Sequence, residues 1–257
     1  MNENTKSDDT KSQKNTVRAA VRALDILLCF AAADSRLGLT EIARRVGLHK
    51  STAHRLLGTL ETKGFVRREP GSDLYQLGWT ILQLAGRVHH SEDMASVALP
   101  FMTRLRDDLG ETISLYVRSH AERIRIQAIE GTQPVRRAAN VGERFPLYIG
   151  ASGKVLLAHL SADEFAILET AGAFPPDMAL PDLHRQLHAV RDRGYAVSKE
   201  EREVGAAAVS APVQDRGGNT VAALSVSGPV NRYDDQTIAR FAIACRETAD
   251  AISHTLA

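Results

Sequence analysis

The chain has 257 residues, of which 44% are hydrophobic and 25% are charged, and its formal net charge at neutral pH is +1. This length allows one or two globular domains of roughly 100 to 200 residues each. The polar N-terminal segment lacks the apolar core of a signal peptide, and no run of about 18 apolar residues occurs, so we expect a cytoplasmic protein without a membrane span.

The charge is divided unevenly along the chain. Residues 1–88 contain 14 Lys and Arg against 9 Asp and Glu, whereas residues 89–257 contain 18 against 22. A basic N-terminal part suits contact with nucleic acid, although a similar excess also occurs in domains that bind none. Cys29 and Cys245 lie in apolar helical patterns, where two isolated thiols cannot supply the clustered ligands of a zinc site. We predict neither a metal nor a cofactor.

The first predicted elements are three helices. Residues 1–16 are polar and predict a disordered tail, and apolar residues then recur at three- and four-residue steps up to about residue 33. The run LTEIARRVGL predicts a short helix with Thr40 as its N-cap and Gly47 at its end. A third helix follows in HKSTAHRLLGTLETKGFV. Two helices joined by a tight turn form the helix-turn-helix pattern, whose second helix enters the major groove of DNA.

The next segment, GFVRREPGSDLYQLG, predicts a β-hairpin with strands over 65–68 and 74–77. A hairpin at this place is a wing, so residues 17–78 are predicted to form a winged helix-turn-helix domain. Tyr75 is expected to pack beneath the wing or to reach a phosphate oxygen. A helical subdomain for protein contacts, with solvated charges, is the alternative. The predicted DNA-contacting residues are Arg18, Arg22, Lys50, Ser51, Thr52, His54, Arg55, Arg67, Arg68 and Tyr75.

After the wing, apolar residues at helical steps predict a linker helix over 79–93 and a further domain over 94–257. Trp79 would mark a dimer contact or pack against the wing or the second domain. Alternating segments around residues 113–128 predict an antiparallel strand pair, and the runs AAAVSAPV and TVAALSVSGP predict another, joined at DRGG. Helices and strands do not alternate strictly, which favours an α+β fold with a central, mainly antiparallel sheet.

The stretch GASGKVLLAHL, residues 150–160, looks at first like a phosphate-binding loop. Its spacing excludes that motif, because Tyr148 stands where the first glycine is required and Val155 where Ser or Thr is required. We predict instead a helix that begins near Ser152 and whose free N–H groups attract a small anion such as a carboxylate. The alternative is that Ser152 only caps this helix.

Three motifs in order resemble the IclR (isocitrate lyase regulator) family of bacterial transcription factors. They are LTEIARRVGLHKSTAHRLLGTLETKGFV with YQLG, then GERFPLYIGASGKVLLAHL, then GYAVSKEEREVGAAAVSAPVQDRGGNTVAALSVSGP. The resemblance covers nearly the whole chain from about residue 17. It implies an N-terminal winged helix-turn-helix, a linker helix and a C-terminal GAF-like α/β effector-binding domain, acting as a homodimer or homotetramer on palindromic operator DNA. His49 departs from the family, in which many members have proline at this position.

The resemblance also implies a site for a small-molecule effector. Phe145 and Leu147 are expected to form an apolar wall, and small side chains suggest an organic acid with an apolar or aromatic body. Helix packing and local backbone hydrogen bonds explain the same small residues equally well. The effector-binding residues implied are Phe145, Leu147, Ala151, Ser152, Ser198, Ala206, Ala208, Ser225 and Ser227.

The sequence therefore predicts a ligand-responsive DNA-binding regulator and not an enzyme. An enzyme acting on a small carboxylate is one alternative, but residues 150–154 do not form a G-x-S-x-G nucleophile elbow and no HExxH motif occurs. The other alternative is a DNA-binding protein that senses no small molecule.

Overall fold

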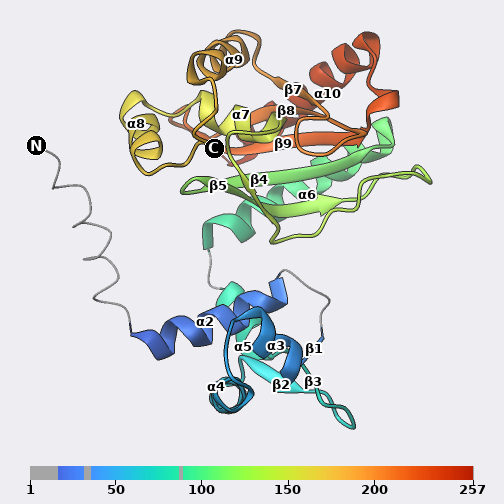
Figure 1. The fold of residues 1–257 in the computed structure, drawn as a ribbon. Helices are drawn as coiled ribbons and strands as arrows, with labels where there is room; N and C mark the ends of the chain where they lie inside the picture. The colour runs from blue at the N-terminus through green and yellow to red at the C-terminus, as the bar shows by residue number, and fades with distance from the viewer. Residues whose placement is uncertain (1–16, 32–35, 87–88, 257) are drawn as a thin grey trace, which may run out of the picture. The chain divides into compact units, whose positions relative to one another are not determined.

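The computed structural model describes residues 17–31, 36–86 and 89–256, so the predicted disordered tail over 1–16 lies outside the described residues. The chain divides into two compact units, residues 1–88 and residues 89–257. Figure 1 labels the helices and strands of both units.

The first unit combines short helices with a small antiparallel sheet whose strand order is β1-β3-β2. The predicted wing is confirmed as the pair β2 and β3, with Arg68 opposite Tyr75 and Val66 opposite Leu77. The elements are α2 (Arg18–Ala31), β1 (Leu37–Gly38), α3 (Leu39–Arg45), α4 (Lys50–Thr62), β2 (Val66–Arg68), β3 (Leu74–Leu77) and α5 (Trp79–Ala85).

The apolar sides of these helices meet in one core. Ile26 and Phe30 of α2, Ile42 of α3 and Leu57 of α4 are buried there together with Tyr75 of β3. The Tyr75 side chain is only 4% exposed. Tyr75 therefore packs beneath the wing, and the predicted contact of Tyr75 with DNA is wrong.

The ends of α3 differ in how well the sequence predicted them. Gly47 has a φ of +62° and lies just after the helix, as expected for a residue in the left-handed region. The N-cap is Gly38 and not Thr40, which lies inside the first turn. The reason is β1: Gly38 pairs with Leu74 of the wing, so the chain leaves the sheet and enters the helix two residues earlier than predicted.

The second unit is built on a six-stranded sheet with the order β6-β5-β4-β9-β8-β7, and every neighbouring pair is antiparallel. Both predicted hairpins are present, because β4 pairs with β5 and β8 pairs with β9. The strands are β4 (Thr112–Ser119), β5 (Glu122–Ile129), β6 (Arg144–Pro146), β7 (Ala196–Lys199), β8 (Ala206–Gln214) and β9 (Thr220–Pro229).

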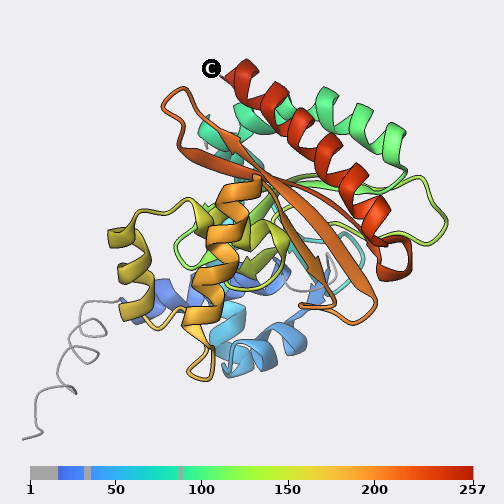
Figure 2. The same ribbon diagram turned by 90° about the horizontal axis from the view of Figure 1, so that it is seen from above.

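Helices cover both faces of this sheet (Figure 2). One face packs against α6 (His89–Leu109) and α10 (Asp235–Leu256), and the other packs against α7 (Ala151–Ala158), with α8 (Ala162–Thr170) and α9 (Leu180–Arg193) outside it. Side chains alternate along each strand, so Leu224 and Val226 of β9 join the first core, whereas Ala223 joins the second. Ser225 lies between Leu224 and Val226 and therefore faces α7.

The predicted linker helix over 79–93 is not continuous in the structure. Helix α5 ends at Ala85 with Gly86 at its C-cap, and α6 begins at His89; residues 87 and 88 lie outside the described part of the chain. Glycine lowers helix stability by roughly 0.5–1 kcal/mol relative to alanine, which accounts for the end of α5. Trp79 is 69% exposed at the start of α5 and packs against the wing through the Arg67 guanidinium, 5.4 Å from the centroid of its ring.

Candidate functional site

Helix α4 presents a polar surface to solvent. Its apolar residues Ala53, Leu57 and Leu60 are buried, so the opposite side of the helix is free for contact. The residues predicted to bind DNA lie on this side or at its border, and short hydroxyl and basic side chains there suit base edges and phosphates. They are Lys50, Ser51, His54 and Arg55, all exposed, and Thr52, which is half-buried.

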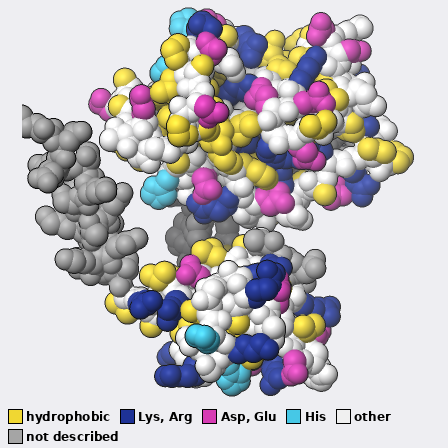
Figure 3. All heavy atoms as spheres, viewed as in Figure 1, with side chains coloured by type: hydrophobic (Ala, Val, Ile, Leu, Met, Phe, Trp, Pro, Cys, Tyr) yellow, Lys and Arg dark blue, Asp and Glu magenta, His cyan; other side chains and the backbone are white. Residues whose placement is uncertain are grey.

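Helix α2 adds basic residues beside α4. Arg22 lines a shallow hollow together with Thr52 and Arg55, and Arg18, one turn earlier, is exposed. This places Arg22 next to the predicted recognition helix. Lys and Arg side chains are spread over the face of the first unit seen in Figure 3.

The wing supplies two exposed arginines in different electrostatic states. Arg68 forms an ion pair with Asp73 in the wing turn. Arg67 stacks on Trp79, and no ion pair of the described residues involves it. A phosphate contact by Arg68 must compete with Asp73, whereas Arg67 meets no such competition from a carboxylate.

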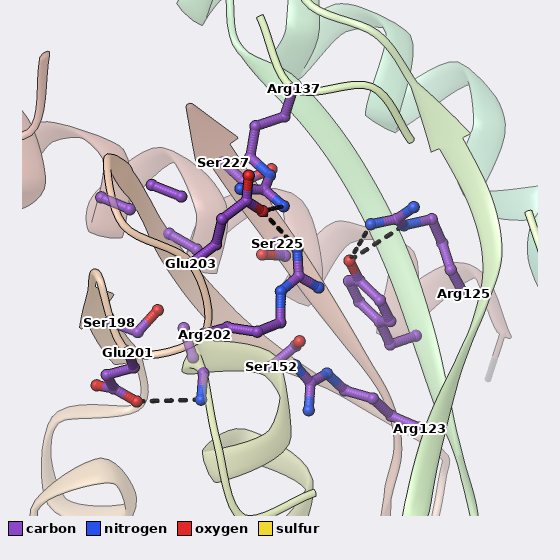
Figure 4. Close-up of a pocket in the computed structure, with 16 residues that line it drawn as sticks. Arg123, Arg125, Arg137, Ser152, Ser198, Glu201, Arg202, Glu203, Ser225 and Ser227 are labelled. Carbon is purple, nitrogen blue, oxygen red and sulfur yellow. Dashed lines mark hydrogen bonds and ion pairs between the residues drawn. The ribbon is translucent and has the colours of Figure 1, made fainter. Parts of the chain in front are cut away.

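The second unit contains a cavity of about 50 Å³ on the α7 face of its sheet (Figure 4). Of the residues predicted to bind an effector, those that line it are Ala151, Ser152, Ser198, Ala206, Ala208, Ser225 and Ser227. Leu147 and Phe145 are not in the lining, so the structure does not place the expected apolar wall at the surface of this cavity. Leu147 is buried in the core beneath α7, and the Arg202 guanidinium covers the Phe145 ring at 4.1 Å from its centroid.

Helix α7 begins at the cavity because glycine allows a close approach there. A Cβ atom on Gly153 would lie 2.1 Å from the carbonyl oxygen of Leu147, a distance that no side chain tolerates. The predicted anion site at this helix start is partly occupied by the chain itself, since the N–H of Gly150 donates to Glu201 at 3.0 Å. Glu201 also binds the buried ammonium group of Lys154. The hydrogen bonds of the described residues leave the N–H groups of Ala151 and Ser152 without an acceptor.

Four arginines that sequence reasoning missed line the cavity: Arg123, Arg125, Arg137 and Arg202. The first two alternate with isoleucines in the run RIRI of β5, so both face α7 while the isoleucines face the opposite core. This alternation of arginine and isoleucine was the available signal. Arg137 and Arg202 lie in loops, where no periodic pattern of the sequence indicates which way a side chain faces.

The arginines differ in their partners. Arg125 donates to the hydroxyl of Tyr116 at 2.9 and 3.1 Å and pairs with Glu143, and Arg137 pairs with Glu203 at 2.8 Å. Arg123 donates only to the carbonyl of Pro146, and its Nε is buried without a partner. The pKa of Arg123 is lowered to about 10, mainly by burial; Tyr116 opposes this shift, and the nearby charges of Arg202 and Arg125 add to it.

In the part of the chain that the structure describes, no helix combines the length and apolar character needed to cross a bilayer. Nor do three or more His, Cys, Asp or Glu side chains gather there in a metal-binding arrangement. A winged helix with exposed basic side chains and a second unit with a polar cavity define the class of DNA-binding regulators with a separate ligand domain.

Comparisons with known proteins identify the family. Residues 19–70 match the IclR helix-turn-helix domain, and residues 86–254 match the bacterial transcriptional regulator IclR C-terminal domain. The chain therefore belongs to the IclR family and is a DNA-binding transcriptional regulator with a C-terminal effector domain. The prediction of a regulator and not an enzyme is confirmed, since the relatives are named as transcriptional regulators.

Two curated relatives come from Escherichia coli K12. The regulator XynR is 32% identical over 245 residues, which cover 93% of this chain and 97% of XynR, and the repressor AllR is 32% identical over 244 residues, covering 93% and 90%. Among solved structures, an IclR regulator from Alicyclobacillus acidocaldarius has a TM-score of 0.78 at 29% identity and covers 94% of this chain and all of its own. An IclR homologue from Microbacterium hydrocarbonoxydans, complexed with 4-hydroxybenzoate, has a TM-score of 0.79 at 26% identity, covering 93% and 98%.

Proposed function

We propose that the protein binds a palindromic operator as a homodimer, or as a homotetramer built from such dimers, and that a small organic acid bound in the α7 cavity changes its operator affinity. The proposed place of action is the cytoplasm, where operator DNA lies. The acid can change operator affinity only if the protein has a conformation with high and one with low affinity for the operator, and if the acid binds one of them more tightly than the other.

The convergence of positive charge on the α7 cavity supports an acidic effector. Arginines are the side chains best suited to hold a carboxylate, because their planar guanidinium groups donate two parallel hydrogen bonds. The start of α7 adds two free N–H groups, and Ser152 and Ser225 add hydroxyls. The relative that binds 4-hydroxybenzoate is similar over nearly the whole chain, which agrees with an acid as the effector.

An exposed apolar stripe on α2 supports the dimer. Val21, Leu24 and Leu28 recur at three- and four-residue steps and are 40%, 58% and 63% exposed, and Val17 precedes them at 70%. Apolar side chains in a row along one helix side suit a symmetric contact with the same helix of a second copy. Two winged helices held in this way would read two half-sites of a palindrome.

The test is footprinting of the DNA upstream of the protein's own gene and its neighbouring gene at about 0.15 M salt, where non-specific phosphate binding is weak. We expect a protected palindrome whose half-site centres are about one helical turn or a multiple apart. Addition of organic acids drawn from the neighbouring operon's chemistry should change the protection. Absence of protection under all these conditions would refute the proposed function.

Arg55 and Arg67 should differ in how they affect DNA binding. Replacing Arg67 with alanine should weaken binding to all sequences alike and reduce the slope of log affinity against log salt by about one unit, because one phosphate contact is lost. Replacing Arg55 should relax specificity at one operator position by about 1–3 kcal/mol if it reads a guanine. Titrations of each variant against operator and scrambled DNA at several salt concentrations measure both effects. Equal slopes in the Arg67 variant and the wild type would remove the wing from the interface.

A further inference from the structure

The cavity and its immediate surroundings contain more positive than negative side chains. Three carboxylates each have one cation as their nearest ion-pair partner: Glu143 has Arg125, Glu201 has Lys154 and Glu203 has Arg137. After these pairings, two cations remain, Arg123 and Arg202.

Neither of these two arginines finds full compensation among the described residues. Arg123 has no ion pair, is only 2% exposed and leaves its Nε without an acceptor. Arg202 lies 3.9 Å from Glu203, which already binds Arg137 at 2.8 Å. Burial lowers the pKa of Arg202 as it does that of Arg123, and the neighbouring charge of Arg137 lowers it further. Both cations are therefore held where the protein alone solvates them poorly.

The two guanidinium groups are close enough for one small molecule to meet both. They approach the same aromatic ring, since the Cζ atoms of Arg123 and Arg202 lie 5.4 and 4.1 Å from the centroid of Phe145. Figure 4 shows the Arg202 guanidinium turned toward Ser225 and Glu203, and it shows Ser152 between the side chains of Arg202 and Arg123. The start of α7, with its two free N–H groups, lies in the same lining.

We infer that the effector is a dianion, a molecule with two carboxylates or an equivalent pair of acidic groups, and that Arg202 is the residue that selects it. This rests on the proposed function of the cavity as an effector site. One acidic group would meet Arg123, Ser152 and the α7 start, and the second would meet Arg202. The effector then supplies the two negative charges that the protein lacks at this place.

The experiment compares acids that share a skeleton but differ in charge. Binding of benzoate against benzene-1,4-dicarboxylate, and of butanoate, hexanoate and octanoate against the dicarboxylates of the same chain length, is measured with the full chain by calorimetry and thermal shift. We expect at least one dicarboxylate to bind at least tenfold more tightly than its monocarboxylate partner. The variant Arg202→Gln should lose that factor while its monocarboxylate affinity changes less than twofold, and Arg202→Lys should retain most of it.

The variant Arg185→Gln is a matched control, because Arg185 is an exposed arginine of α9 that does not line the cavity. Three results would each overturn the inference. The monocarboxylates could bind as tightly as their dicarboxylate partners, no dicarboxylate could bind at all, or the preference for dicarboxylates could survive in the Arg202→Gln variant. Operator binding is measured on the same samples without acid. If the protein binds operator DNA but does not prefer dicarboxylates, only the inference of a dianionic effector is refuted. If it does not bind operator DNA, the proposed function as a regulator is refuted.

Discussion

Replacing Leu24 and Leu28 together with glutamine should lower operator affinity by about 10²- to 10⁴-fold. If the α2 stripe joins two copies, its loss removes the linkage between two DNA-binding heads, and linkage alone contributes a factor of this size. Glutamine is a good helix former and adds no charge near the DNA, so α2 itself should persist. Gel shifts with the full operator measure the affinity, and sedimentation equilibrium measures the oligomeric state.

The same double variant should bind an isolated half-site within a fewfold of the wild type, because the residues predicted to contact DNA are untouched. Ile167→Gln is the matched control, since Ile167 is an apolar residue of α8 that is 66% exposed and lies outside the stripe. A double variant that sediments like the wild type would show that the α2 stripe does not hold the copies together.

Replacing Glu201 with alanine should lower the free energy of unfolding of the second unit by about 3 kcal/mol. Lys154 is only 5% exposed, and its remaining hydrogen-bond partner would be the side-chain amide of Gln186 at 3.2 Å. Removing one member of a buried ion pair leaves the other charge without compensation, which typically costs 3–5 kcal/mol. The N–H of Gly150 would also lose its acceptor. Urea unfolding followed by circular dichroism measures the change.

Two further variants distinguish the cost of leaving the Lys154 charge unpaired from other effects of changing the loop that contains Glu201. Adding Lys154→Met to the Glu201→Ala variant should recover most of the lost stability, because a methionine of similar length needs no counter-charge. Glu203→Ala, two residues away, removes a carboxylate whose side chain is 62% exposed, and it should cost less than about 1 kcal/mol. Equal losses in the two single variants would contradict a special role for the pair of Lys154 and Glu201.

Much of the fold follows from local patterns in the sequence. The β4–β5 and β8–β9 hairpins were predictable because strand periodicity and turn residues occur together in each. The helix over Ala162–Thr170 was predictable from the spacing of Ser161 and Glu164, whose side chains form a reciprocal cap in the structure. In each case the residues that decide the structure are close neighbours in the chain.

What the sequence did not predict depends on contacts between distant segments. Strand β1 has only two residues, and it exists because Leu37 and Gly38 pair with the wing. The arginine cluster needs the register of β5 and the return of the loop at Arg202, about 80 residues later, to the Phe145 ring. Burial of Tyr75 likewise depends on α2, which precedes it by more than 40 residues. Such contacts leave no periodicity in the chain itself.

The stacking of Arg67 on Trp79 also gives the protein a built-in optical reporter. Trp79 is the only tryptophan of the chain, so the indole fluorescence of the whole protein comes from the base of the wing. A guanidinium group above the ring alters the emission of the indole, and a phosphate that draws Arg67 away removes that influence. Emission from unlabelled protein can therefore follow engagement of the wing with DNA in real time, separately from events in the effector domain.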